Sequence, residues 1–261
     1  MRILFLTQDD PLYILPFFDE FLRNYAHEFE IALIASSRTM GGRARSKMLK
    51  ELIQLYGILG TTKLVARLCT SRFFGLFPKV GGTPRYHTLA QACHAFGVPL
   101  SKIGNPNDPK FIQTVRRTAP DILVSVACPY ILKSPLLSIA PRGAINIHHS
   151  PLPRYKGMMP TFWQLFHGEK TVGLTIHYMV ARVDEGMALL QESQEIRPEE
   201  SLDQLIKRCK RRGAHCMAEV LRKIESGEAE AVALDHSRGS YFSFPTGAEI
   251  REFRKRGLRA I

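Results

Sequence analysis

Short apolar runs that alternate with helical stretches constrain the fold of this 261-residue chain more than any other feature. Such runs are typical of strands buried on both faces of a sheet, and strands that alternate with helices pair in parallel. The sequence therefore predicts an α/β fold with a doubly wound, mostly parallel sheet. We expect strands at Arg2–Thr7, Phe29–Ala35, Val98–Ile103, Asp121–Val126 and Gly143–His148, and helices at Ile14–His27, Thr88–Phe96 and Asp108–Thr118.

Residues 38–86 interrupt this alternation at a place where one short crossover would suffice. They contain two predicted helices, Arg43–Tyr56 and Thr61–Phe74, followed by the Gly- and Pro-rich stretch FPKVGGTPR. We interpret the segment as a helical insertion in the α/β domain. It could cap a cleft or form a contact between subunits, and the oligomeric state is equally open.

The second half of the chain continues the pattern. A strand is predicted at Met187–Ile196 and a long helix at Ser201–Glu225, where Ser201 and Gln204 have the spacing of a capping box. We assign residues 1–228 to one catalytic domain and residues 229–261 to a short basic C-terminal extension.

The chain carries an excess of positive charge, with a net charge of +12. Such charge attracts nucleic acid, phosphate or carboxylate ligands, but it also occurs as a plain soluble surface. Basic residues cluster in KRCKRR (Lys207–Arg212) and REFRKRGLR (Arg251–Arg259). The first cluster falls on the predicted long helix, so we expect its charges on the solvent side.

Composition argues against several classes of protein. No run of about 18 apolar residues occurs, so we expect no membrane span and no membrane partner. Asp9 and Asp10 end the apolar N-terminal run too early for a signal peptide. The five cysteines are scattered without a CxxC pair, which argues against a disulfide framework or a zinc site and fits a reducing cytoplasm.

The residues that could carry chemistry lie between Gly143 and Gln191. Alternate side chains of a strand share a face, so Asn146 and His148 point the same way while Ile147 points into the core. Ligands of open parallel sheets bind beyond the carboxyl ends of the strands, where this amide and imidazole lie. By chemistry alone the pair could equally cap its own loop, and Asp184 could be an ordinary turn residue.

The order of residues over this stretch resembles the folate-dependent formyltransferase family. The pattern NIHxS-LPxYxG is followed by Gly, Thr and His within one strand and then by DxG. Besides Asn146, His148 and Asp184, the matching positions are Ser150, Leu152, Pro153, Tyr155, Gly157, Pro160, Gly173, Thr175, His177 and Gly186. Looser similarity covers residues 88–228. The family includes glycinamide ribonucleotide transformylase, methionyl-tRNA formyltransferase and amino-sugar formyltransferases, and its Rossmann-like fold agrees with the predicted sheet.

The resemblance implies roles for the three residues. The family moves a formyl group from 10-formyltetrahydrofolate, used as a co-substrate, to an amine. Asn146 and, when protonated, His148 would donate hydrogen bonds to the formyl oxygen as charge develops there, and one such donor contributes about 3–4 kcal/mol. Asp184 would accept the proton of the amine, directly or through water, or would hold His148 charged and oriented. No metal and no covalent intermediate is required.

The resemblance also assigns the walls of the site. The pterin ring would bind at Cys128, Pro129, Tyr130, Ile131 and Leu132, with Val180 and Val183 of the loop before Asp184 on the opposite side. Candidate substrate contacts are Ser150, Tyr155, Lys156 and Gly157. We interpret His149, Trp163 and Phe166 as structural, while His177 could face either the core or the site.

Departures from the family pattern reduce the number of candidate acceptor substrates. The first strand leads into TQDDPLYILP, whereas glycinamide ribonucleotide transformylase has a Gly-rich phosphate loop there, and without glycine the backbone N–H groups cannot easily cradle a phosphate. The residues after Gly227 are few for the second domain of a methionyl-tRNA formyltransferase, and Pro151 stiffens the loop after Ser150. We therefore expect a small-molecule amine, such as an amino sugar or a natural-product intermediate.

Three alternatives stand beside this expectation. The first is formylation of methionyl-tRNA, with the basic tail on the RNA phosphates. The second is hydrolysis of formyltetrahydrofolate, in which water replaces the amine. The third is a non-enzymatic RNA- or folate-binding protein, which the complete set of Asn146, His148 and Asp184 disfavours.

Overall fold

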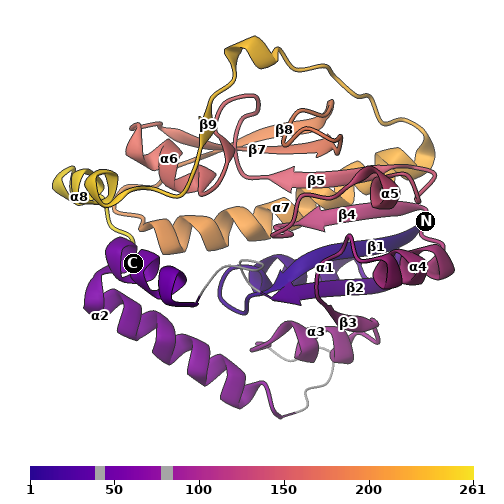
Figure 1. Cartoon of the computed structure of the whole chain (residues 1–261), viewed down its shortest axis with the longest axis horizontal. Coiled ribbons are helices and arrows are strands. Elements are labelled where there is room, and N and C mark those ends of the chain that lie inside the picture. The colour runs from indigo at the N-terminus through magenta and orange to yellow at the C-terminus, as the bar shows by residue number, and fades with distance from the viewer. Residues whose placement is uncertain (39–44, 78–84) are drawn as a thin grey trace.

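The computed structural model describes residues 1–38, 45–77 and 85–261, and its elements follow the predicted alternation (Figure 1). The strands are β1 (Arg2–Asp9), β2 (Glu30–Arg38), β3 (Leu100–Ile103), β4 (Ile122–Val126), β5 (Ala144–His148), β6 (Lys156–Gly157), β7 (Thr171–Tyr178), β8 (Ala188–Glu195) and β9 (Tyr241–Phe242). The helices are α1 (Leu15–Tyr25), α2 (Arg45–Phe74), α3 (Leu89–Ala95), α4 (Pro109–Thr118), α5 (Ser134–Leu137), α6 (Pro160–Phe166), α7 (Leu202–Ser226) and α8 (Gly247–Lys255), with a short 3-10 turn at His236–Arg238.

Within the described ranges, seven strands form the main sheet in the order β3-β2-β1-β4-β5-β7-β8. The first five strands of this order are parallel to their neighbours, while β7 is antiparallel to both β5 and β8. The chain starts inside the sheet at β1, winds outward to β3 and then builds the other half from β4. This is the doubly wound, mostly parallel sheet that the sequence predicts, with its reversal between β1 and β4.

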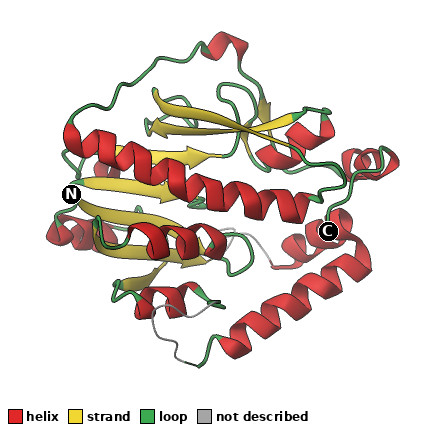
Figure 2. Ribbon diagram, turned by 180° about the vertical axis from the view of Figure 1, so that it is seen from behind, coloured by secondary structure: helices red, strands yellow, loops and turns green. Residues whose placement is uncertain are grey.

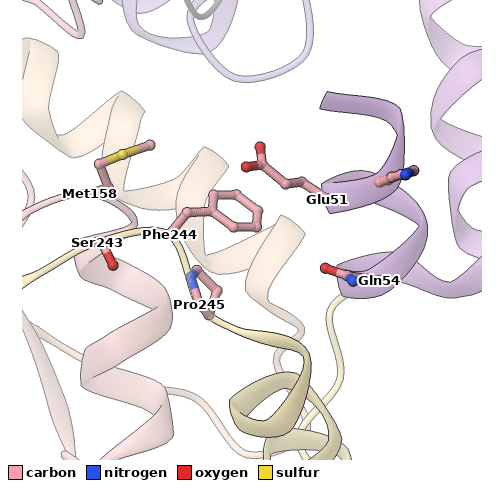
Figure 3. A pocket seen from close by; sticks show the side chains of 7 residues that line it. Glu51, Gln54, Met158, Ser243, Phe244 and Pro245 are labelled. Atoms are coloured by element: carbon pink, nitrogen blue, oxygen red, sulfur yellow. The ribbon is translucent and has the colours of Figure 1, made fainter. Parts of the chain in front are cut away.

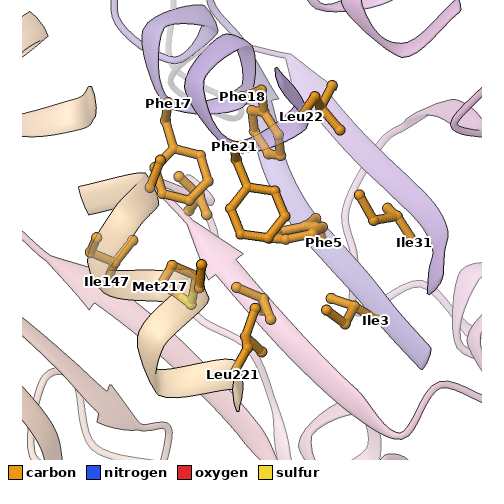
Figure 4. Packing of buried hydrophobic residues seen from close by; sticks show 14 of the residues in the cluster. Ile3, Phe5, Phe17, Phe18, Phe21, Leu22, Ile31, Ile147, Met217 and Leu221 are labelled. Atoms are coloured by element: carbon orange, nitrogen blue, oxygen red, sulfur yellow. The ribbon is translucent and has the colours of Figure 1, made fainter. Parts of the chain in front are cut away.

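Strand β1 shows why the sheet is covered on both faces. Ile3 and Phe5 point to one face and Leu4 and Leu6 to the other, and all four are fully buried. On the Phe5 face lie α1, α3 and α7, of which α7 is the long helix that crosses the sheet in Figure 2. Phe5 packs edge-on against Phe21 of α1, with 5.2 Å between ring centroids (Figure 4). Helices α4 and α5 cover the opposite face.

The predicted helical insertion is present as α2, which consists of two helical segments joined at Gly57. Gly57 has a φ of 70° and a ψ of 174°, a left-handed conformation that glycine adopts without strain and that ends the first segment. Leu55, Tyr56 and Leu64 pack into a second hydrophobic core together with α6, α7 and α8. Most of the Gly- and Pro-rich stretch after α2 falls on residues 78–84, outside the described residues.

The C-terminal tail packs into this second core. Strand β9 pairs in parallel with β6, and Phe253 of α8 stacks on Phe162 of α6 with 4.7 Å between ring centroids. Three arginines of the tail donate hydrogen bonds to main-chain carbonyls: Arg254 to Gln54 and Leu55, Arg256 to Phe166, and Arg259 to Glu199. Part of the basic cluster therefore satisfies carbonyl groups at the ends of helical segments.

The expectation that the charges of Lys207–Arg212 face solvent is wrong for Lys210. This side chain is buried because its face of α7 packs against the body of the domain. Burial lowers the pKa of Lys210 from 10.5 to about 8, while the neighbouring Cys209 and Asp10 act in the opposite direction. Its neighbours in the cluster, Arg208 and Arg212, form ion pairs with Glu200 and Glu192.

Replacing Phe253 by Ala tests whether the tail stabilises the whole domain. The ring is buried against Phe162, and truncating a buried Phe to Ala costs about 3–5 kcal/mol. We expect the free energy of unfolding in urea to fall by about that amount within one cooperative transition. Phe73→Ala is the matched control, because Phe73 is exposed and its truncation should change stability by less than about 0.5 kcal/mol. A Phe253→Ala variant as stable as this control would contradict the prediction.

Candidate active site

Strand β5 carries Asn146 and His148 to the edge at which the parallel strands end. Ile147, between them, is buried in the main core, as the alternation predicts. In the pairing of β5 with β7, Asn146 lies opposite His177 and His148 lies opposite Thr175. Directly paired residues share one face of a sheet, with their Cβ atoms about 4.5–5.5 Å apart. The antiparallel strand therefore places His177 beside Asn146.

The loop between β7 and β8 brings Asp184 to the same place. The φ of Asp184 is 54°, a left-handed conformation that Asp tolerates better than most residues. Gly186 lets the loop close, because a Cβ at this position would lie 1.7 Å from the carbonyl oxygen of Tyr178. The Asp184 carboxylate is buried, and its Oδ2 accepts a hydrogen bond of 3.1 Å from the Gly157 amide. The structure thus brings the three residues predicted as catalytic together.

Two histidines face the Asp184 carboxylate. Nδ1 of His148 lies 3.7 Å from Oδ2, and Nε2 of His177 lies 3.7 Å from Oδ1. Both separations exceed the length of a hydrogen bond, so the contacts of the two rings with the carboxylate are electrostatic. Within the described ranges, no group of three or more His, Cys, Asp or Glu side chains is arranged to hold a metal ion.

The ring of His148 is fixed by a backbone contact. Its Nε2 donates a hydrogen bond of 2.9 Å to the carbonyl oxygen of Tyr155, which leaves Nδ1 toward Asp184 and the site. Because both ring nitrogens face oxygen atoms, a doubly protonated ring would satisfy both contacts. The geometry thus identifies Nδ1 as the atom through which His148 can act.

His177 belongs to the site, a question that its position in the sequence left open. Its Nδ1 donates to the carbonyl oxygen of Tyr178 at 2.8 Å, and its Nε2 accepts from Nδ2 of Asn146 at 3.3 Å. Burial lowers the pKa of His177 below 6.5, while the Tyr178 contact and the Asp184 charge act in the opposite direction. A neutral ring satisfies this arrangement and orients the Asn146 amide. The register in which β7 pairs with β5 places His177 at the site, and this register could not be read from the sequence.

The loop after β5 is held by its own residues. Ser150 is fully buried, and its hydroxyl donates to the carbonyl oxygen of Arg154 at 3.0 Å. Thr175 of β7 donates to the Ser150 carbonyl at 2.7 Å. Gly173 allows the loop to lie against β7, because a Cβ there would be 2.4 Å from the nitrogen of Pro151. Ser150, predicted to contact substrate, thus lies inside the loop that positions the site.

The other candidate substrate contacts also have protein partners. The hydroxyl of Tyr155 donates to Glu169 at 2.8 Å, and Nζ of Lys156 lies 3.0 Å from Glu185. Gly157 has a φ of 92°, and a Cβ there would meet the carbonyl oxygen of Phe242 at 2.4 Å. Gly157 therefore allows β9 to approach β6 while its amide reaches Asp184. Substrate contact by these residues stays a prediction.

The predicted pterin loop, Cys128–Leu132, follows β4 and adjoins the end of β7. Leu132 is buried under α4 and α5, and both Cys128 and Met179 pack against the same core. Burial raises the pKa of the Cys128 thiol to about 11, which leaves it protonated and unreactive at neutral pH.

Apolar side chains are exposed on both predicted walls of the pterin site, which are the Cys128–Leu132 loop and the loop before Asp184. Ile131 is 66% exposed, and Val180 and Val183 are also exposed. Asn107 holds the backbone of the Cys128–Leu132 loop. Its Nδ2 donates to the Ile131 carbonyl at 2.9 Å, and its Oδ1 accepts from the Lys133 amide at 2.8 Å. Exposed apolar groups on a fixed backbone are what a flat, partly apolar ligand needs.

A cavity of about 400 Å³ lies next to the Gly157 segment (Figure 3). Its lining residues are Lys50, Glu51, Gln54, Met158, Ser243, Phe244 and Pro245. Figure 3 shows Glu51 of α2 pointing toward Phe244 of the tail across this space. Met158 directly follows Gly157, whose amide binds Asp184, so one lining residue of the cavity is the sequence neighbour of a residue that holds the candidate active site. No local pattern could have indicated these residues, because α2 and the tail meet only in the folded chain.

Comparison with known proteins identifies the family. Residues 85–221, more than half of the chain, match the family described as formyl transferase, and the chain therefore belongs to it. The methionyl-tRNA formyltransferase of Syntrophus aciditrophicus (strain SB) is 36% identical over 150 residues, which are 58% of this chain and 48% of that protein. That of Chlorobium chlorochromatii (strain CaD3) is 36% identical over 152 residues, with the same coverage. The chain thus spans about half the length of the curated relatives it matches.

Solved structures show the same fold. Glycinamide ribonucleotide transformylase 1 from Symbiobacterium toebii superposes with a TM-score of 0.59 at 18% identity, covering 90% of this chain and 94% of that one. A sugar N-formyltransferase from Shewanella sp FDAARGOS_354 gives 0.55 at 17% identity, covering 93% and 76%. A sugar 3N-formyl transferase solved in the presence of dTDP and 5-N-formyl-THF gives 0.56 at 14% identity, covering 100% and 82%.

His149, interpreted as structural, is buried away from the site against α7. Neither of its ring nitrogens has a hydrogen-bond partner, and a Cβ on Gly213 of α7 would lie 3.4 Å from its Cε1. Burial, followed by the nearby charge of Lys210, lowers the pKa of His149 well below 6.5. The ring is therefore neutral in the folded protein.

Because His149 is buried in its neutral form, we expect the folded protein to lose stability in acid. Below about pH 6.5 this histidine is protonated in the unfolded chain but stays neutral in the folded chain. The free energy of unfolding therefore falls, by up to about 1.4 kcal/mol per pH unit for each buried histidine of this kind. We expect His149→Leu to flatten this dependence when urea unfolding is measured on both sides of pH 6.5, with a remainder from His177. His27→Leu, at an exposed ring, is the control. An equal slope in the His149→Leu variant and the wild type would contradict the prediction.

Proposed function

We propose that this protein transfers the formyl group of 10-formyltetrahydrofolate to a primary amine. The observation that carries the proposal is the convergence of Asn146, His148 and Asp184 at the carboxyl end of β5, in a chain that belongs to the formyl transferase family. Two hydrogen-bond donors and a carboxylate are the groups that acyl transfer to an amine requires.

Asn146 and His148 act on the formyl oxygen, where negative charge develops as the amine attacks. His177 accepts one N–H of the Asn146 amide and leaves the other free for this oxygen. The Tyr155 carbonyl occupies Nε2 of His148, so Nδ1 is its donor. Each such donor, held in place before the reaction, contributes about 3–4 kcal/mol to the transition state.

Asp184 accepts the proton that the attacking amine must lose. The Gly157 amide fixes its Oδ2, and the rings of His148 and His177 stand 3.7 Å away on either side. A carboxylate held this way can take the proton directly or through one water. No metal has a part in this proposal.

The folate, which supplies the formyl group on its N10 atom, would bind between the Cys128–Leu132 loop and the loop before Asp184. The exposed side chains of Ile131, Val180 and Val183 would flank the ring, and main-chain groups of Cys128–Leu132 would pair with its polar edge. The structural relative solved with 5-N-formyl-THF supports this part of the proposal.

The acceptor that we propose is a small-molecule amine that enters through the cavity between α2 and the tail. A volume of about 400 Å³ lies within the range of small-ligand sites. The carboxylate of Glu51, the amide of Gln54 and the ring of Phe244 suit a hydroxylated amine such as an amino sugar. Arginines of the tail that could hold RNA already bind main-chain carbonyls.

Methionyl-tRNA is the second candidate acceptor. Its support is the 36% identity to two curated methionyl-tRNA formyltransferases, over about half of their length. Hydrolysis of formyltetrahydrofolate would use the same residues with water in place of the amine, and no further observation favours it.

Substitutions at the site test the reaction. We expect Asn146→Ala and His148→Ala each to lower kcat by about 10²–10³-fold, because each removes an oxyanion donor. Release of tetrahydrofolate measures turnover, and retained binding of a reduced folate analogue shows that the fold is intact. His94→Ala, at an exposed ring, is the control. Unchanged turnover in His148→Ala would rule out its assignment.

A second set of measurements tests the acceptor. We expect turnover with nucleotide-linked amino sugars and little with methionyl-tRNA. Phe244→Ala should raise the KM for the amine by about tenfold through the loss of aromatic contact area, while the KM for the folate stays the same. The control is Val232→Ala, since this side chain is exposed and does not line the cavity. A Phe244→Ala effect on the folate KM alone would place the acceptor elsewhere.

A further inference from the structure

An apolar patch lies on the insertion, away from the proposed reaction. Nine of the fifteen large hydrophobic side chains that are exposed in the described part of the chain lie between Leu49 and Phe77. The patch comprises Ile58, Leu59, Val65, Phe73, Phe74, Leu76 and Phe77. Leu59 is 71% exposed, Phe73 58% and Leu76 78%. Exposed apolar residues normally occur singly, so a concentration of this kind marks an interaction surface.

The second segment of α2 presents this patch on one side. Leu64 and Ser71 face the body of the protein and are buried. Leu59, Ala66 and Phe73 recur at intervals of seven residues, so they share the opposite side of the helix, and all three are exposed. Figure 1 shows this segment along one edge of the molecule, with the rest of the fold on its other side.

The aromatic end of the patch is held in place. The rings of Phe73 and Phe77 contact edge-on, with 5.6 Å between centroids. Gln91 of α3 donates from its Nε2 to the carbonyl oxygens of Phe74 and Phe77. These contacts tie the end of α2 to the domain, while the Phe73 and Phe77 side chains stay exposed.

The charged residues of the insertion after Glu51 have one sign, although Arg67 pairs with Asp203 of α7. Between Glu51 and Asp108 the sequence contains six Lys and Arg residues and no Asp or Glu. On the helix, Lys63 lies on one flank of the apolar side and Arg72 on the other, and both are exposed. A helix with an apolar side, cationic flanks and no acid is typical of segments that lie in the plane of an anionic membrane surface.

A second copy of the chain is a poorer occupant. If two copies packed through the patch, the cations beside one helix would meet those of the other with no carboxylate from this segment to pair with them. An anionic lipid surface instead offers phosphate groups to Lys63 and Arg72 and hydrocarbon to the apolar side chains. No described helix is long and apolar enough to span a bilayer, so the contact would be peripheral.

We propose, in place of the expectation that the protein has no membrane partner, that the outer side of the second α2 segment binds anionic phospholipid membranes peripherally. Ile58, Leu59, Phe73, Leu76 and Phe77 enter the interface, and Lys63 and Arg72 contact lipid phosphates. The proposal does not depend on the formyl transfer reaction, because none of these residues lines the cavity or the candidate active site.

Vesicle flotation of the full chain tests the proposal. We expect the protein to float with vesicles of phosphatidylcholine mixed with phosphatidylglycerol, not with phosphatidylcholine alone, and to bind more weakly as salt screens the charges. The double variant Leu59→Glu, Phe73→Glu should lose about tenfold or more of its partitioning, since it replaces apolar groups by anions. Lys63→Glu, Arg72→Glu should lose binding while it keeps the apolar patch. Val232→Glu, at a side chain that is 61% exposed on another surface, is the matched control.

Retained folate binding and an unchanged circular dichroism spectrum show that each variant is folded. The proposal is overturned if the wild type fails to float with anionic vesicles, or if both double variants float like Val232→Glu. Sedimentation velocity tests the alternative that a second copy of the chain packs on the patch. A dimer that Leu59→Glu, Phe73→Glu converts to monomer, in a protein without affinity for vesicles, would assign the patch to a second copy and overturn the proposal.

Discussion

The Asp184 carboxylate contacts residues from three separate segments of the chain. Its oxygens meet the Gly157 amide, the His148 ring of β5 and the His177 ring of β7. Two close approaches make this possible, one at Gly186 against Tyr178 and one at Gly157 against β9. A side chain at either glycine would collide with a carbonyl oxygen, so the charge in the site depends on backbone packing several residues away.

The site therefore rests on two kinds of structure. The antiparallel pair of β5 and β7 supplies Asn146, His148 and His177 of the candidate site, and motif residues such as Gly173 and Thr175 hold the loop between the two strands in place. The cavity lined by Met158 is bounded by α2 and by the tail, which lie far apart in the sequence. The candidate catalytic groups and the proposed acceptor cavity thus lie on separate parts of the chain.

The order of elements could be predicted because each strand and helix is encoded locally, by apolar periodicity and by caps such as Ser201 and Gln204. Asn146 and His148 could be placed together because they share one strand. Asp184 could be placed only through the resemblance, since its position depends on the turn at Gly186. His177 needed the register of β7 on β5, and Lys210 was wrongly expected at the surface because its burial depends on what packs against α7.

Helix α2 contributes both to the proposed acceptor cavity and to the apolar patch. One side of its first segment faces the cavity through Glu51 and Gln54, and the outer side of its second segment carries the apolar patch. Gly57 separates the segments, while Leu55 and Leu64 on either side of it anchor both in the same core as the tail. Packed side chains of one core therefore join the second segment to the first, which lines the cavity. If the two proposals hold together, contact with a membrane would bear on the acceptor cavity and leave the β5–β7 pair, with its formyl transfer groups, unchanged.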